Sequence, residues 1–286
     1  MVSAPAGENA EELMIRYSAI IADGSFPCNT AILQGDMRTV FRQAGEAGYD
    51  CVQLTIRDRS DYSVEELRAL SAEYGLQISA MATGRVYTVD GYSMASSDET
   101  NRRMCVERLR DLADFSVLLG RPALVVGAVR GRYADARSPE EYYRQFDKSL
   151  HELTDYCEKI DVPVILEVIE RAESEAYCDP EETRRYVEGF RSPNLHMYLD
   201  VMHLHNEGMD VPAAIRKYGR FSRQIDISGE NRTAPMDSAL DFAKIAEAIR
   251  TSGFRGTLAF EMPPSPPEDS ARKSLRFIKG LLEQDK

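Results

Sequence analysis

The feature that most constrains the fold of this chain is an alternation of short apolar runs with longer segments of helical periodicity. Eight runs rich in apolar and β-branched residues predict strands, at residues 15–21, 49–54, 76–81, 123–129, 162–169, 196–202, 223–228 and 257–262. Segments that repeat apolar residues at helical spacing lie between them, at residues 64–74, 106–119, 140–159, 181–190, 212–219 and 239–253, and one more follows the last strand at residues 271–284. Eight such units in 286 residues predict an α/β fold, a closed (β/α)8 TIM barrel.

Local signals support the predicted helices and exclude one alternative fold. Ser138-Pro139 and Asp179-Pro180 each place a capping side chain before a proline suited to the first helical position, and Ser63 is a similar cap without proline. No G-x-G-x-x-G motif follows the first predicted strand. A dinucleotide-binding, doubly wound sheet is therefore excluded.

The chain shows no linker or shift in composition that would divide it. We therefore predict one domain over residues 1–286, in which residues 1–11 form a loose leader. The start has no basic segment followed by an apolar one, and no run approaches 18 apolar residues. The five cysteines are widely spaced, without a C-x-x-C pair. These features predict free thiols in a cytoplasmic protein that is neither secreted nor membrane-spanning.

The balance of charge excludes one class of partner. Lys and Arg number 35 against 47 Asp and Glu, which gives a formal net charge of −12. Binding to nucleic acid depends on clustered basic side chains that neutralise phosphates. We therefore expect no nucleic-acid partner.

Four acidic residues end the last four predicted strands: Glu167, Asp200, Asp226 and Glu261. Catalytic side chains of a TIM barrel gather at these carboxyl ends. Because side chains two apart share a face of a strand, the apolar residues that alternate with the four acids would pack against the helices, and the acids would point into the barrel mouth. Four converging carboxylates repel unless a cation lies among them. We therefore predict a divalent metal site, with Mn or Mg favoured by the all-oxygen ligands and Co or Zn as further possibilities.

Several motifs resemble one known group of barrels. They are EVIERAE at 167–173, LDVMH at 199–203, GENR at 229–232 and FE at 260–261. Weaker pieces are Thr83-Gly84, Asp98 with Arg103, Gly120, and Gly127-x-x-Arg130-Gly131. In order and spacing these motifs resemble the xylose-isomerase-like sugar isomerase/epimerase superfamily, particularly its ketose 3-epimerase, hydroxypyruvate isomerase and sugar phosphate isomerase branches.

The resemblance implies a reaction and roles for individual residues. The chain would be a metal-dependent isomerase or epimerase of a small keto-sugar or sugar phosphate, and a homodimer or homotetramer. Protons would move at a carbon beside a metal-polarised carbonyl. The implied roles are Glu167 and Glu261 as acid/base pair and metal ligands, Asp200 as a ligand only, and Glu173, His203 and Arg232 as contacts to substrate oxygens.

One position departs from the resembled family. There the seventh strand of the barrel usually supplies a histidine ligand, and this chain has Asp226. The four acids would surround a divalent ion with surplus negative charge, which Arg232, protonation or a second cation could offset.

The same scaffold allows three other functions. A lyase on the same scaffold, such as an inosose or dehydroshikimate dehydratase, also begins by abstracting a proton next to a carbonyl. An apurinic endonuclease would need several histidines and a basic surface, whereas this chain has four histidines in all. A binding protein that keeps the barrel without catalysis would not need a metal.

Other polar residues near the predicted strand ends have two interpretations each. Arg57, Arg130 and Arg132 could bind a phosphate or carboxylate of the substrate, or form salt bridges. Tyr87 and Tyr92 could wall the pocket or cover the rim. For the remaining histidines we favour a packed interior residue at His196, a loop residue at His205 and a surface residue at His151.

Overall fold

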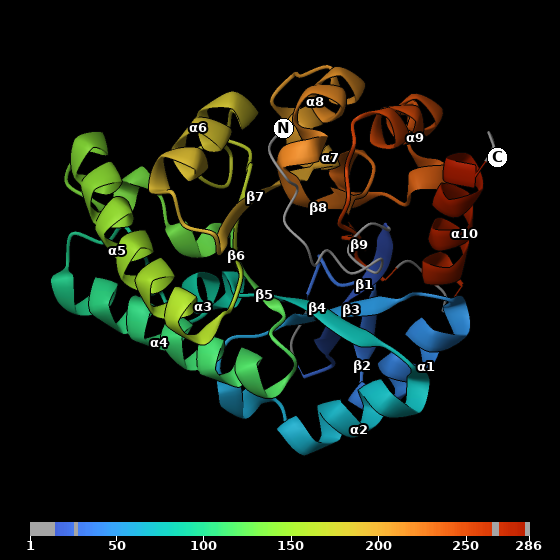
Figure 1. Ribbon diagram of the computed structural model, residues 1–286, viewed down its shortest axis with the longest axis horizontal. Coiled ribbons are helices and arrows are strands. Elements are labelled where there is room, and N and C mark those ends of the chain that lie inside the picture. Colours follow the sequence, from blue (N-terminus) through green and yellow to red (C-terminus); the bar gives the residue numbers. More distant parts are fainter. Residues whose placement is uncertain (1–14, 26–27, 265–268, 284–286) are drawn as a thin grey trace, which may run out of the picture.

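The computed structural model describes residues 15–25, 28–264 and 269–283. The leader predicted at residues 1–11 lies outside the described residues. The described part shows a ring of strands surrounded by helices (Figure 1).

One parallel sheet closes on itself. Its strand order is β2-β1-β3-β4-β5-β6-β7-β8-β9, and β1 also pairs with β9. The bounds are β1 Arg16–Asp23, β2 Leu33–Gly35, β3 Cys51–Thr55, β4 Gln77–Ala82, β5 Ala123–Val126, β6 Val164–Glu167, β7 Leu195–Asp200, β8 Ser222–Ile227 and β9 Thr257–Phe260. Eight of these strands correspond to the eight predicted runs, so the predicted (β/α)8 barrel is confirmed. The short β2, beside β1, was not predicted, because three residues are too few to show a pattern.

Helices pack around this barrel. They are α1 Met37–Ala47, α2 Val64–Tyr74, α3 Gly84–Thr88, α4 Glu99–Leu118, α5 Pro139–Ile160, α6 Pro180–Phe190, α7 Val201–Asn206, α8 Val211–Tyr218, α9 Phe242–Thr251 and α10 Ser270–Glu283. The predicted caps are confirmed: the side chains of Ser63, Ser138 and Asp179 accept hydrogen bonds from the first turns of α2, α5 and α6. Helix α1 was not named from the sequence, although Met37, Val40, Phe41 and Ala44 repeat at helical spacing.

The hydrophobic residues form separate layers inside and outside the strands. The outer layer joins strands and helices and includes the residues predicted to face outward: Val164, Leu166, Leu199, Ile225, Ile227, Leu258 and Phe260. Two small clusters fill the barrel interior, one of Ala80, Ala123, Val125, Ile165 and Tyr198, and one of Ile20, Ala22, Ala31 and Ala259. The predicted alternation is therefore correct, and the residues two before Glu167, Asp200 and Glu261 face inward.

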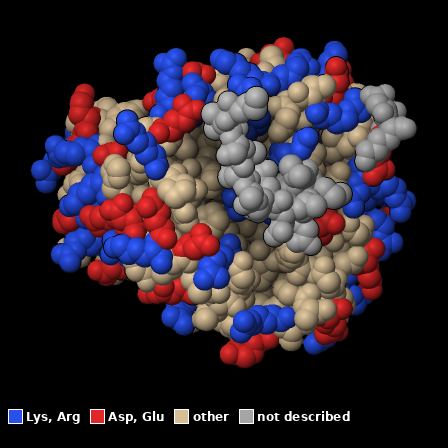
Figure 2. All heavy atoms as spheres, in the orientation of Figure 1, with Lys and Arg blue, Asp and Glu red and all other residues tan. Residues whose placement is uncertain are grey.

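The surface view agrees with the charge balance. Figure 2 shows basic and acidic side chains interspersed around the rim of one face, which is hollowed near its middle. This face carries no continuous basic area among the described residues. In the same part of the chain, no helix has the length and apolarity needed to cross a membrane. All five cysteines are unpaired, as predicted.

Candidate active site and metal centre

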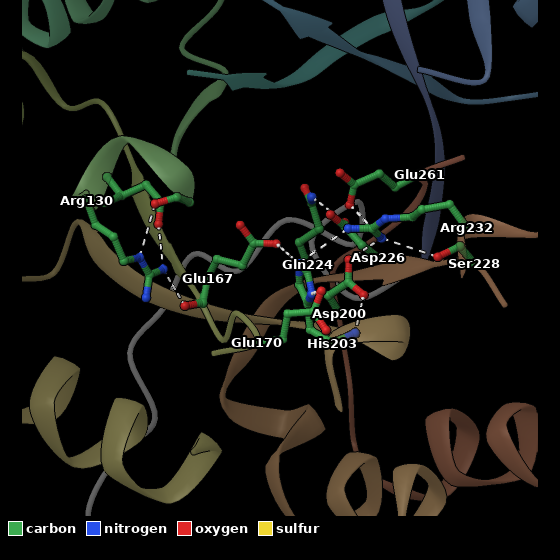
Figure 3. A network of polar contacts seen from close by, with 12 residues as sticks. Arg130, Glu167, Glu170, Asp200, His203, Gln224, Asp226, Ser228, Arg232 and Glu261 are labelled. Atoms are coloured by element: carbon green, nitrogen blue, oxygen red, sulfur yellow. Dashed lines mark hydrogen bonds and ion pairs between the residues drawn. The ribbon is translucent and has the colours of Figure 1, made fainter. Parts of the chain in front are cut away.

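The four predicted carboxylates meet at one place. Glu167 and Asp200 end β6 and β7, Asp226 is the second-last residue of β8, and Glu261 directly follows β9. Each contributes one oxygen to a group whose atoms all lie within 4.8 Å of one another. Figure 3 shows the four side chains gathered in one place. Asp200 and Asp226 are 0% and 1% exposed and Glu167 is 6% exposed, so these charges lie largely out of water.

Asp200 is held by the helix that it begins. It caps α7, and its Oδ1 accepts a hydrogen bond of 3.0 Å from the main-chain N–H of His203. The three-residue spacing between Asp200 and His203 therefore has a local cause. The main-chain N–H of the third residue after a helix cap has no partner within the helix, and the capping side chain accepts its hydrogen bond. The same turn places the imidazole of His203, which is 2% exposed, with Nε2 3.4 Å from Glu167 Oε1.

Arg232 bridges two of the carboxylates. Its Nη1 lies 2.6 Å from Asp200 Oδ2 and 3.1 Å from Glu261 Oε2. It lies in a short turn, Glu230–Arg232, after β8, where both Asn231 and Arg232 have positive φ. Two successive non-glycine residues with positive φ are energetically unfavourable, and such backbone strain is found most often at functional sites. The turn thereby directs a guanidinium onto the acidic cluster.

The carboxyl groups have very different proton affinities. Burial raises the pKa of Asp226 well above its usual value, and the charges of Glu261, Asp200 and Glu167 raise it further. Burial raises the pKa of Glu261 to about 8, against the lowering effect of Arg232. Burial acts the same way on Asp200, but Arg232 and His203 outweigh it and hold its pKa below the usual value. In the absence of a cation, protons on Asp226 and Glu261 relieve the repulsion.

This arrangement fits a divalent cation. The four residues supply oxygen donors, which hard cations such as Mn²⁺ and Mg²⁺ prefer. Glu261 Oε2 is buried and accepts no hydrogen bond, so its contact is the ion pair with Arg232. Oxygens of Asp226 and Glu261 lie within 4.8 Å of each other, and a cation between them would relieve the repulsion that raises the pKa of Asp226.

The side chain of Glu167 fills a space left by a missing Cβ. A Cβ on Gly127, the residue after β5, would lie only 2.2 Å from Glu167 Oε2 and 4.0 Å from Tyr198 Oη. Tyr198, two residues before Asp200, is buried beneath the carboxylates and hydrogen bonds with Glu167. Glycine at 127 and the tyrosine hydroxyl together determine where this carboxylate lies.

The loop after β6 brings further acids near His203. Glu170 Oε1 lies 3.8 Å from His203 Nδ1. Oxygens of Glu170 and Glu173 and a nitrogen of His203 lie within 4.8 Å of one another, and Glu173 is exposed. All seven site residues predicted from the sequence thus lie in one region: Glu167, Glu173, Asp200, His203, Asp226, Arg232 and Glu261.

Arg130 fits neither of its two predicted interpretations, because its guanidinium binds main-chain oxygens instead of a substrate anion or an acidic side chain. It is 0% exposed and donates to main-chain oxygens of Gly127, Val126, Ala176 and Glu167 (Figure 3). Its guanidinium therefore ties the ends of β5 and β6 to the loop before α6.

The two other arginines form salt bridges. Arg57 lies 3.5 Å from Asp90, and Arg132 lies 3.2 Å from Glu175. The tyrosines cover the rim, since Tyr87 donates to Asp135 at 3.4 Å and Tyr92 packs partly buried against the outer core.

The remaining histidines lie outside the carboxylate cluster. His196 is half-buried at the start of β7, where burial lowers its pKa to about 4. His151 is on the surface of α5, stacked on Phe190. The loop predicted at His205 is wrong, because this exposed residue belongs to α7, which Asp200 starts earlier than the strand pattern indicated.

Sequence reasoning missed the residues that support the carboxylates from below. These are Tyr198 under Glu167, and Gln224, which with Gln53 lies under Asp226. The alternation placed Tyr198 and Gln224 on the inward face, but no sequence pattern indicated which groups they would meet.

Known proteins resemble this chain along most of its length. The L-ribulose 3-epimerase of Mesorhizobium japonicum is 25% identical over 239 residues, which are 83% of this chain and 79% of that protein. The fructoselysine 3-epimerase of Escherichia coli O157:H7 is 23% identical over 279 residues, 92% of this chain and 98% of that protein.

A solved structure shares the fold. The D-allulose 3-epimerase from Methylomonas sp. matches with a TM-score of 0.78 at 21% identity, covering 93% of this chain and 99% of that one. The sequence profile of the xylose isomerase-like TIM barrel matches residues 41–281. This chain therefore belongs to the xylose isomerase-like TIM barrel family.

Proposed function

We propose that this protein is a divalent-metal-dependent epimerase or isomerase of a small keto-sugar or its phosphate. The observation that carries the proposal is the position of Glu167 and Glu261. They stand on the first and last of four successive strands and face one cluster, with Asp200 and Asp226 between them. The names of the related proteins, which are sugar 3-epimerases, support the same class of reaction.

The chemistry follows from two carboxylates on either side of one carbon. Glu167 would remove a proton from the carbon beside a substrate carbonyl, and Glu261 would return one from the other side. Glu167, Asp200, Asp226 and Glu261 would hold the cation. When bound, it would supply a positive charge that polarises the carbonyl and stabilises negative charge on the neighbouring oxygen.

The surrounding residues would bind and orient the sugar. Arg232 and His203 lie against the carboxylates, with 3.3 Å between Arg232 Nη2 and His203 Nε2, and both present nitrogen atoms to a sugar oxygen. Glu173, on the exposed side of His203, would accept a hydrogen bond from a hydroxyl group. Arg232 would also offset part of the acidic charge.

Isotope exchange tests this proposal. Incubating the Mn-loaded protein with a panel of ketoses and ketose phosphates in deuterated water should introduce deuterium beside the carbonyl of at least one. An enone absorbance or loss of water would instead identify a dehydratase. If no sugar exchanges and none is altered, the proposed reaction is wrong.

Metal binding should change the pH dependence of stability. The raised pKa values of Asp226 and Glu261 mean that the folded metal-free protein binds protons that the unfolded chain has released. Its stability should therefore fall as pH rises from 5 to 8. We expect a Tm at pH 8 at least about 4 °C below that at pH 5.5, since 1 kcal/mol corresponds to about 2–4 °C in a large domain.

Manganese should counteract this loss, because it binds the deprotonated carboxylates. The increase in Tm on saturation with Mn should be greater at pH 8 than at pH 5.5, measured by differential scanning calorimetry. Glu261→Gln should remove much of the pH dependence. A metal-free Tm that stays constant or rises over this range would contradict the proposed charge distribution.

A further inference from the structure

Asp226 stands at the position where the resembled family usually has a histidine ligand. Beneath it lies a pair of buried side-chain amides. We propose that Gln224 and Gln53 are positioning residues, which hold Asp226 so that it serves as an oxygen ligand of the cation. This inference rests on the metal site of the proposed function. It concerns residues that touch neither the cation nor the substrate.

The contacts between the three side chains are short and buried. Gln224 Nε2 donates to Asp226 Oδ1 at 2.6 Å (Figure 3). It also donates to Gln53 Oε1 at 2.9 Å. Gln224 and Gln53 are each 2% exposed, and Asp226 is 1% exposed. The amide nitrogen of Gln224 has two hydrogens, and both are used.

The bond between the two glutamines crosses the barrel interior. Gln224 is on β8 and Gln53 on β3, and β9 and β1 stand between these strands in the closed sheet. On the intervening strands, Thr257 of β9 pairs with Gln224 and Ile20 of β1 pairs with Gln53. The amide pair therefore forms part of the floor beneath the carboxylates.

Two acceptors fix the orientation of Gln224. If its amide were turned over, its oxygen would face both the carboxyl group of Asp226 and the carbonyl of Gln53, and these acceptors would repel. The amide N–H group of Gln224 is therefore held in the orientation that donates to Asp226 from below. On the side of the cluster, an oxygen of Asp226 lies within 4.8 Å of one of Glu261.

A donor in this position suits an aspartate better than a histidine. A neutral imidazole bound to a metal presents its other nitrogen as an N–H, which needs an acceptor beneath it. The N–H group of Gln224 would oppose that hydrogen, whereas it complements a carboxylate. Gln224 and Asp226 are therefore a matched pair, and the resulting all-oxygen ligand set favours Mn²⁺ over Zn²⁺.

Calorimetric titration of the metal-stripped full chain with Mn²⁺ tests the inference. Gln224→Met keeps the side-chain length but removes the donor, and we expect Mn²⁺ affinity to fall about tenfold or more, the usual effect of losing a partner of a metal ligand. Gln53→Met leaves that donor in place and should reduce affinity less. Equal Mn²⁺ affinity in Gln224→Met and the parent chain would overturn the inference.

A matched control separates positioning from general damage to the interior. Ser18 is 0% exposed and hydrogen bonds with Ser79 at 2.9 Å on the β1 side of the barrel. Ser18→Ala should leave Mn²⁺ affinity unchanged even if it lowers Tm. Should Gln224→Met fail to fold, Gln224→Asn, which withdraws the amide from Asp226, is expected to show the same loss of affinity.

A double-mutant cycle makes the test specific for Asp226. In an Asp226→Asn background, Gln224→Met should cause little further loss of Mn²⁺ affinity, because the supported carboxylate is already gone. Independent, additive losses would overturn the inference. If the parent chain binds no Mn²⁺ at all, the proposed metal site itself fails, so the two failures are distinguishable.

Discussion

Glu167→Gln should reduce deuterium exchange into the substrate by about a thousandfold or more, since general base catalysis contributes roughly 10²–10⁴-fold. Glutamine has the same shape but cannot accept the proton. The measurement should be made at saturating Mn²⁺, because the variant is also expected to bind the metal more weakly. The contacts of Glu167 with Tyr198 and the close approach of Gly127 favour an unchanged side-chain position, so the loss would report on the chemistry.

Glu170→Gln is the matched control for this result. Glu170 lies three residues after Glu167, in the loop after β6 and close to His203, but it does not belong to the four-carboxylate cluster. Its substitution removes a nearby negative charge and should leave most of the exchange rate. If Glu167→Gln retains more than a tenth of the exchange rate, or if both variants lose activity equally, Glu167 is not the base.

Arg130→Met should lower the free energy of unfolding by about 3–5 kcal/mol. A buried donor or acceptor left without a partner costs about 1–3 kcal/mol, and four main-chain oxygens accept hydrogen bonds from this one side chain. The costs are not additive, because neighbouring groups adjust. Urea unfolding followed by circular dichroism measures the change. The free energy of unfolding of Arg130→Lys should lie between those of the parent chain and Arg130→Met.

Arg132→Met provides the comparison for Arg130. Arg132 is two residues along the chain, and its side chain is 39% exposed in the salt bridge with Glu175. Exposed ion pairs contribute about 0–1 kcal/mol, so the loss should be small. A loss below about 1 kcal/mol for Arg130→Met would show that water replaces its hydrogen bonds and that it does not tie β5 to β6.

The comparison of Arg130 and Asp226 shows what kind of site residue could be predicted. Asp226 was found because it lies near the end of a strand in the inward register, which is a local property. Arg130 also follows a strand, but its four acceptors come from the ends of β5 and β6 and from the loop before α6. A position near a strand end therefore indicated that Arg130 belongs to the site region without indicating what it binds.

The short elements show a similar limit. Helix α1 carries apolar residues at helical spacing and a capping Asp36, so its signal was present and was overlooked. Strand β2 has three residues and forms because it can pair with the end of β1. Its existence depends on a partner strand, and no local pattern of that length identifies it.

Local periodicity in the sequence was enough to determine the barrel and the inward direction of the four carboxylates, because strand alternation acts within a few residues. Only the tertiary structure decided which donor each carboxylate meets. Gln53 and Gln224 are 171 positions apart and touch because closure of the sheet brings β3 and β8 across one interior. Distances across a closed barrel depend on all its strands together, and that information is not contained in any single segment.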